Sequence, residues 1–275
     1  MLHCAGAPRT GRPVSDTLLI DEPADHVRRL TLHRPDRRNA LDLATMEAFV
    51  AALRDADSDT EVRAIVLAAS DPVFCAGLDL AEVGAGVIDL REVGERGDDP
   101  WVALQQATTP TVAAVNGAAV TGGLELVLAC DLAVASQQAR FADTHARVGI
   151  HPSGGLTVLL PRYVGRRAAL GMSLTGRFVD AQEAVTLGLV NAVVAHDELA
   201  DTAVATAVAI TEADPRVLPE ILGTYRAVDG LQLDEAFATE RERAFGVDVD
   251  ASAVEERRAG IIARGSGLTK DGREG

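Results

Sequence analysis

The chain has little positive charge, few cysteines and no long hydrophobic run, and each shortage excludes a class of protein. Its 26 lysines and arginines stand against 41 aspartates and glutamates, which gives a formal net charge of -15 at pH 7. Nucleic acid and anionic membrane surfaces need a basic face, so we expect neither partner. Any anionic ligand must therefore be held by local arginines.

The cysteines, Cys4, Cys75 and Cys130, are odd in number and lack the spacing of metal ligands. Neither a disulfide framework nor a metal site is therefore predicted, and we expect a reduced, cytoplasmic setting. The chain has no run of about 18 apolar residues, and residues 1–15 lack the apolar core of a signal peptide. Export and membrane spanning are not expected.

What the chain does contain is typical of a soluble globular protein: 47% hydrophobic and 24% charged residues over a length of 275. Residues 27–32 read as a strand, and apolar runs at 64–69, 111–115 and 132–135 are of the kind buried in a parallel sheet. Helical patterns separate these runs, and Asp42 is placed to cap one of the helices. The sequence predicts an α/β fold.

From Leu199 onward the pattern is nearly all helical. We therefore predict a flexible N-terminus at 1–15, an α/β core at 16–198, a helical C-terminal subdomain at 199–264 and a flexible tail at 265–275. Several C-terminal helices are apolar on more than one face, which suggests packing on another subunit. Residues 84–100, punctuated by glycine, are predicted to form a mobile insertion over a binding site.

Two glycine-bearing segments, residues 74–80 and 116–125, carry the clearest functional signal. Each puts small residues at a bend leading into a helix, where unpaired backbone N–H groups collect. A helix beginning near Gly122 would present the positive end of its dipole to an anion. Alternatively, Gly122 and Gly123 only allow tight packing, and the sequence leaves both interpretations open.

Glu125 lies in an otherwise apolar helical stretch that we expect to be buried on all sides. A buried carboxylate needs a partner or a chemical purpose. As a general acid or base, it would face the same cavity as Gly122, one helical turn away. As a structural residue, it would complement the helix dipole or close a cap.

Taken together, these motifs resemble those of the crotonase superfamily, which contains the enoyl-CoA hydratases and isomerases. The resemblance runs over residues 16–265, and its matching segments are 32–35, 39–41, 74–80, 116–125, 130–131, 141–149, 152, 174–176, 181 and 184–190. It implies a spiral of β-β-α units followed by C-terminal helices that build a homotrimer, often doubled into a hexamer. It also implies an acyl-CoA substrate, with no metal and no redox cofactor.

By this resemblance, the backbone N–H groups of Leu78 and Gly122 form an oxyanion hole that holds the thioester oxygen of an enolate. Each donor would contribute about 3 kcal/mol to the stabilisation. The implied coenzyme A contacts are Arg34, Phe74, Ala76, Gly77, Asp79 and Gly123. Arg37 and Arg38 are candidate phosphate partners, with a solvated charge cluster as the alternative.

Hydratases of the family use two glutamates, and Glu125 matches the one that activates water. The second position falls on His145, where this chain departs from the pattern. Histidine also donates and accepts protons near neutral pH, so we expect an enoyl-CoA hydratase with a Glu125/His145 pair. The alternatives are an isomerase, a decarboxylase, a thioester hydrolase or a non-catalytic acyl-CoA-binding protein. His145 would otherwise only line the pocket, and His151 is a further candidate for that role.

Overall fold

The computed structural model describes residues 9–89, 91–93, 99–249, 251–252, 254–255, 257–258 and 262. The chain divides into two units, Met1–Pro215 and Arg216–Gly275. The first unit contains both glycine-bearing segments and all the candidate site residues.

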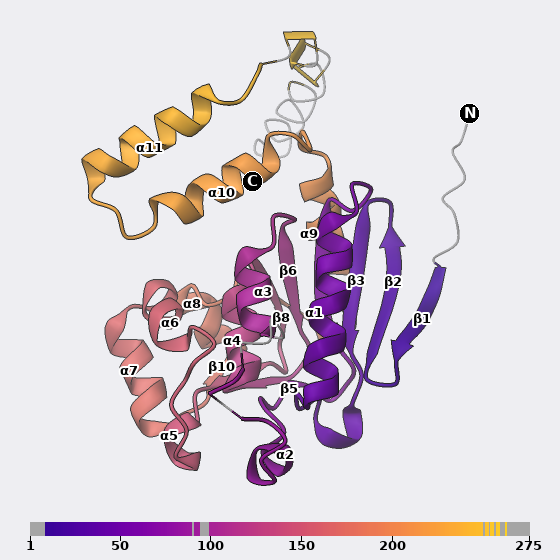
Figure 1. The fold of residues 1–275 in the computed structure, drawn as a ribbon, viewed down its shortest axis with the longest axis vertical. Coiled ribbons are helices and arrows are strands. Elements are labelled where there is room, and N and C mark those ends of the chain that lie inside the picture. The colour runs from indigo at the N-terminus through magenta and orange to yellow at the C-terminus, as the bar shows by residue number, and fades with distance from the viewer. Residues whose placement is uncertain are drawn as a thin grey trace, which may run out of the picture. The chain divides into compact units, whose positions relative to one another are not determined.

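A seven-stranded sheet organises the first unit (Figure 1), in the order β1-β2-β3-β4-β6-β8-β11. Its strands are β1 (Arg9–Ser15), β2 (Leu18–Ala24), β3 (Val27–Leu32), β4 (Ala64–Ala69), β6 (Thr111–Val115), β8 (Leu132–Ser136) and β11 (Ala192–Val194). The pairings from β3 to β11 are parallel, while β1 and β2 add an antiparallel edge. The four strands predicted from the sequence are confirmed.

Residues 9–15, which the sequence assigns to a flexible N-terminus, form strand β1, which pairs with β2 in an irregular register. The physical reason is that the outer edge of β2 offers unpaired backbone groups, which a neighbouring segment satisfies whatever its side chains are.

A smaller four-stranded sheet carries the two bends. Its order is β10 (Val179–Asp180), β9 (Arg140–Ala142), β7 (Ala118–Val120) and β5 (Val73–Cys75). β5 and β7 pair in parallel, so their carboxyl ends lie at the same edge of the sheet. The first glycine bend follows β5 and the second follows β7, and the sheet therefore brings them together.

Helices cover both faces of the large sheet. The helices of this unit are α1 (Leu43–Ser58), α2 (Leu80–Gly84), α3 (Pro100–Gln106), α4 (Gly122–Ala129), α5 (His145–Val148), α6 (Leu156–Val164), α7 (Arg166–Thr175), α8 (Ala181–Leu187) and α9 (Leu199–Thr211), with 3-10 turns at Pro35–Arg37 and His196–Glu198. Asp42 caps α1 as predicted, accepting a hydrogen bond from the Thr45 N–H over 2.8 Å. Ile65 and Leu67 of β4 face the core that α1 shares, whereas Ala64 and Val66 face α9.

The C-terminal helices divide differently from the prediction. Helix α9 was expected to begin a separate subdomain at Leu199, but it belongs to the first unit, which ends at Pro215. Its buried residues Leu199, Ala203 and Ala207 pack against the valines of β4, β6 and β8. Burial of this apolar stripe on the sheet is the physical reason for the later boundary.

The second unit is a helical hairpin of α10 (Leu218–Val228) and α11 (Leu233–Phe245), in the part of the chain where the sequence pattern is nearly all helical. Arg243 of α11 pairs with Glu220 of α10 over 3.0 Å. No residue of either helix is buried in the described chain, and Tyr225 and Phe237 are exposed. Most of the chain from residue 250 onward, including the predicted tail at 265–275, falls outside the described residues, as do residues 90 and 94–98 of the predicted insertion.

Candidate active site

The two glycine bends meet at van der Waals distance. A Cβ atom built on Gly122 would lie 3.4 Å from the Cα of Gly77 and 3.7 Å from the backbone nitrogen of Leu78. Gly77 has a φ of +95°, a conformation that a residue with a side chain rarely adopts. The backbone N–H groups of Leu78 and Gly122 donate to no backbone acceptor within the described part of the chain. Both are therefore available to a ligand oxygen.

Gly122 and Gly123 differ in what a Cβ atom at each position would contact. A Cβ on Gly123 would lie 2.1 Å from the carbonyl oxygen of Cys75, so this glycine lets α4 pack closely against β5. Tight packing, the alternative left open by the sequence, accounts for Gly123. A Cβ on Gly122 would instead approach the Trp101 ring at 2.9 Å and occupy space in front of the Leu78 nitrogen.

A cavity of about 70 Å³ opens at this point. The residues that line it include Ala76, Leu78, Trp101, Gly122, Glu125 and His145. Both bends, the first turn of α4 and the segment around α5 thus contribute to one small enclosure.

Glu125 is 2% exposed and reaches this cavity from α4. Its Oε1 accepts hydrogen bonds from the backbone N–H groups of Gly154 at 2.8 Å and Leu156 at 3.3 Å. Burial raises the pKa of Glu125, and the charge of His145 and these two hydrogen bonds only partly offset the effect. A carboxylate with a raised pKa is a stronger base once ionised, which suits proton abstraction near neutral pH.

His145 faces Glu125 across the cavity, with its Nε2 atom 3.8 Å from the Glu125 Oε2 atom. The other ring nitrogen, Nδ1, lies 2.8 Å from Oδ1 of Asp143. Burial opposes ionisation of Asp143, but hydrogen bonds from the side chains of His145 and Ser173 and from the His145 backbone hold the pKa of Asp143 below its ordinary value. The structure thus brings the predicted pair together and adds a carboxylate behind the histidine.

Two of the residues assigned to coenzyme A, Arg34 and Asp79, contact each other and other groups of the protein. Arg34 donates to the carbonyl oxygen of Ala40 and forms ion pairs with Asp42 at 2.9 Å and Asp79 at 3.3 Å. Asp79 also caps α2, accepting from the Ala81 N–H at 3.1 Å. Arg34 and Asp79 are thus engaged within the protein.

Of the remaining assigned residues, Ala76 lines the cavity, while Phe74 is fully buried in the hydrophobic core. Arg37 and Arg38 are exposed, as a solvated pair would be. His151 lines the cavity, as the sequence suggested for a pocket histidine.

Two residues of the site were not assigned from the sequence. Trp101 of α3 donates from its indole Nε1 to the carbonyl oxygen of Gly122 at 2.8 Å. Asp143, two residues before His145, is 1% exposed. A buried acid next to a candidate catalytic histidine is a signal that could have identified Asp143, whereas nothing near Trp101 in the sequence points to α4.

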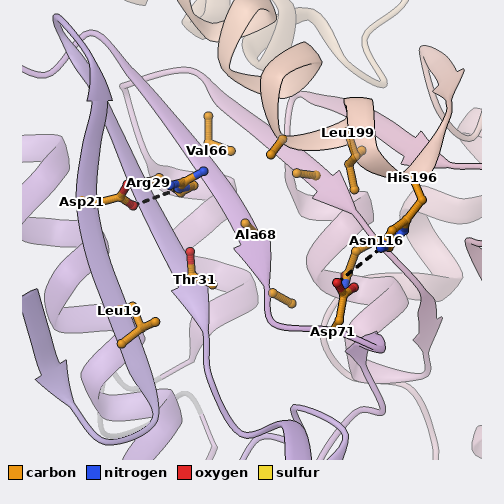
Figure 2. A pocket seen from close by; sticks show the side chains of 13 residues that line it. Leu19, Asp21, Arg29, Thr31, Val66, Ala68, Asp71, Asn116, His196 and Leu199 are labelled. Atoms are coloured by element: carbon orange, nitrogen blue, oxygen red, sulfur yellow. Dashed lines mark hydrogen bonds and ion pairs between the residues drawn. The ribbon is translucent and has the colours of Figure 1, made fainter. Parts of the chain in front are cut away.

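A second, larger cavity of about 340 Å³ lies on the sheet face covered by α9 (Figure 2), where Val66 and Leu199 line it. Its ionisable side chains contact each other: Arg29 forms an ion pair with Asp21, and Nε2 of His196 lies 3.3 Å from Oδ2 of Asp71. Neither Glu125 nor His145 lines it. The Glu125 carboxylate, the His145 imidazole and the two glycine bends all lie at the smaller cavity instead.

Comparison with solved structures identifies this architecture as the crotonase fold. A crystal structure of an enoyl-CoA hydratase from Mycobacterium smegmatis has a TM-score of 0.81 and 37% identity, covering 90% of this chain and 97% of that chain. The enoyl-CoA hydratase structure from Mycobacterium tuberculosis H37Rv has a TM-score of 0.71 and 45% identity, covering 83% of this chain and 98% of that chain.

Sequence comparison places the chain within a family. A family model described as enoyl-CoA hydratase/isomerase matches residues 22–263. A probable peroxisomal enoyl-CoA hydratase 1 of Arabidopsis thaliana is 37% identical over 234 residues, 84% of this chain and 87% of the plant protein. The chain belongs to the enoyl-CoA hydratase/isomerase family, as its motifs predicted. Within the described residues, no helix has the length and apolar character needed to cross a membrane.

Proposed function

We propose that this protein is an enoyl-CoA hydratase, which adds water across the double bond of a 2-enoyl-CoA thioester. The observation that carries the proposal is the pairing of Glu125 and His145, with 3.8 Å between Oε2 and Nε2, in a cavity edged by two unpaired N–H groups. Both groups needed to move protons are thus within reach of one small substrate region.

In the proposed mechanism, the thioester oxygen accepts hydrogen bonds from the N–H groups of Leu78 and Gly122. As the water oxygen bonds to C3, the electrons of the double bond move toward the thioester oxygen. The negative charge therefore develops on the atom that accepts hydrogen bonds from the two N–H groups. Loss of one such donor in comparable sites lowers kcat by about 10²- to 10³-fold. The positive end of the α4 dipole adds to the stabilisation, because Gly122 is the first residue of that helix.

Glu125 takes a proton from the attacking water, and imidazolium His145 gives a proton to C2 of the enolate. The product is then a 3-hydroxyacyl-CoA, with Glu125 protonated and His145 neutral. Transfer of a proton from Oε2 to Nε2, either directly or through water, restores the starting state. No metal or redox cofactor is required in this scheme, because the side chains of Glu125 and His145 carry out both proton transfers.

The remaining features of the proposal concern assembly and location. We expect a homotrimer or a dimer of trimers, and the apolar side chains left exposed on α10 and α11, such as Tyr225 and Phe237, support self-association. We place the protein in the cytoplasm on the basis of Cys75 and Cys130, which are both free and buried thiols.

Incubation of the purified protein with crotonyl-CoA tests the activity, with loss of the conjugated thioester absorbance as the readout. Formation of 3-hydroxybutyryl-CoA, abolished in Glu125→Gln, is the expected result. A rise of that absorbance from a 3-enoyl-CoA would indicate an isomerase, and release of a free thiol would indicate a thioester hydrolase. If the protein only binds acyl-CoA, the wild type and Glu125→Gln should bind it equally well, and neither should show turnover.

A further inference from the structure

Asp143 makes an unusually complete set of contacts for a buried carboxylate beside a histidine. It is 1% exposed and lies between β9 and α5. Its Oδ1 atom accepts from the backbone N–H of His145 at 3.1 Å and lies 2.8 Å from Nδ1 of the same residue. Ser173 of α7 supplies a further hydrogen bond to this carboxylate. The contacts come from two elements, so the carboxylate is fixed relative to the cavity.

These contacts determine which ring nitrogen of His145 carries a proton. An ionised carboxylate only accepts hydrogen bonds, so the Nδ1 atom that faces Asp143 must be the protonated one. Nε2 is then the nitrogen that exchanges protons, and it faces Glu125 and the cavity. Without Asp143, the neutral imidazole would be free to adopt the other tautomer and to rotate.

We infer that Asp143 is a positioning residue for the hydration reaction. It holds His145 with Nδ1 protonated and directs Nε2 to the α carbon of the substrate. A histidine can then serve as the acid at a position where the family hydratases have a glutamate. This inference rests on the proposed function, but its physical core, the Asp143–His145 coupling, is measurable without turnover.

Nuclear magnetic resonance of protein labelled at histidine nitrogens tests the coupling directly. The His145 signals are assigned by their loss in His145→Gln. In wild-type protein, we expect neutral His145 to carry its proton on Nδ1. In Asp143→Asn and Asp143→Ala, neutral His145 should carry its proton partly or wholly on Nε2, because the carboxylate that requires a donor at Nδ1 is lost. Asp180→Asn is the matched control, because Asp180 caps α8 and asparagine caps equally well.

The kinetic constants provide the functional readout. In Asp143→Asn, kcat should fall, because part of the neutral His145 would no longer carry its proton on Nδ1 with Nε2 directed to the substrate. KM should change little, since Asp143 does not line the cavity. Ser173→Ala, which keeps the carboxylate, should lower kcat less and serves as the second variant if the Asp143 variants do not fold.

Two results would overturn the inference. One is a wild-type His145 that carries its neutral-state proton on Nε2. The other is an unchanged His145 tautomer in folded Asp143 variants. If the wild-type protein does not hydrate any enoyl-CoA, the proposed function fails, yet the tautomer measurements still decide whether Asp143 controls His145.

Discussion

The indole Nε1 of Trp101 donates a hydrogen bond to the carbonyl oxygen of Gly122 over 2.8 Å. This bond ties α3 to the first residue of α4, whose N–H group is a proposed oxyanion donor. Trp101 is 2% exposed and its ring lines the cavity. A ligand that enters the cavity must therefore contact the residue that orients the bend.

Binding of an unreactive acyl-CoA should change the fluorescence of the protein. Trp101 is the single tryptophan of the chain, so the emission comes from the cavity wall. We expect titration with butyryl-CoA to change the intensity or wavelength of this emission in a saturable way, because a bound acyl group replaces water beside the ring. Free butyrate is the control. Calorimetrically detected butyryl-CoA binding without any change in emission would place the ligand elsewhere.

Gly122→Ala should reduce kcat by at least about 10²-fold, the loss expected for one disabled oxyanion donor. The added methyl would lie 3.7 Å from the Leu78 nitrogen and 2.9 Å from the Trp101 ring, so it enters the space proposed for the thioester oxygen. Gly84→Ala is the matched control, because a Cβ there meets nothing within 4 Å. Equal activity of these two variants, measured with crotonyl-CoA, would argue against the proposed oxyanion site.

Acid should inactivate the enzyme at a pH above the ordinary value for a glutamate. Glu125 acts as a base only when ionised, and burial raises its pKa from 4.5. Activity is therefore present above the raised pKa and is lost as the pH falls through it. The acid limb of the kcat/KM profile reports this pKa in the free enzyme. A limb at or below pH 4.5, in protein shown by circular dichroism to remain folded, would contradict the assignment of Glu125 as the base.

Arg34→Gln should destabilise the fold by about 3–5 kcal/mol, because the largely buried carboxylates of Asp42 and Asp79 would lose their cationic partner. The side chains of Arg34, Asp42 and Asp79 are 16%, 13% and 14% exposed. Arg37→Gln, at an exposed position nearby, should change stability by less than about 0.5 kcal/mol. Denaturant unfolding of both variants gives the comparison. Weakened acyl-CoA binding with wild-type stability in Arg34→Gln would instead favour the ligand contact implied by the family resemblance.

The sequence predicts the large sheet well because strands buried on both faces are continuous apolar runs, as at 64–69 and 111–115. Strands β5, β7, β9 and β10 have two or three residues each, too few to show a periodicity. The sequence of helix α9 has an apolar stripe in either case, whether that stripe packs on the sheet or on another subunit. Only the tertiary contacts show that α9 belongs to the first unit.

The candidate site also contains residues that the sequence identifies and residues whose role depends on the folded structure. Glu125 is identifiable because a lone carboxylate in an apolar helix is costly to bury. The role of Asp143 depends on Ser173, which lies thirty positions further along the chain and meets the carboxylate only after α7 has packed near α5. The ion pair between Arg34 and Asp79 likewise forms only when the first glycine bend lies next to the loop that carries Arg34.

The most direct test of the central claim compares crotonyl-CoA hydration by wild-type protein, Glu125→Gln, His145→Ala and the double variant, with butyryl-CoA binding measured in each. If Glu125 and His145 act as one unit, each single variant loses about 10² to 10⁴ in kcat. The double variant should then lose little more than the worse single variant, because residues that act together are not additive. Wild-type hydration rates in His145→Ala would contradict the paired mechanism and leave His145 as a residue that only lines the cavity.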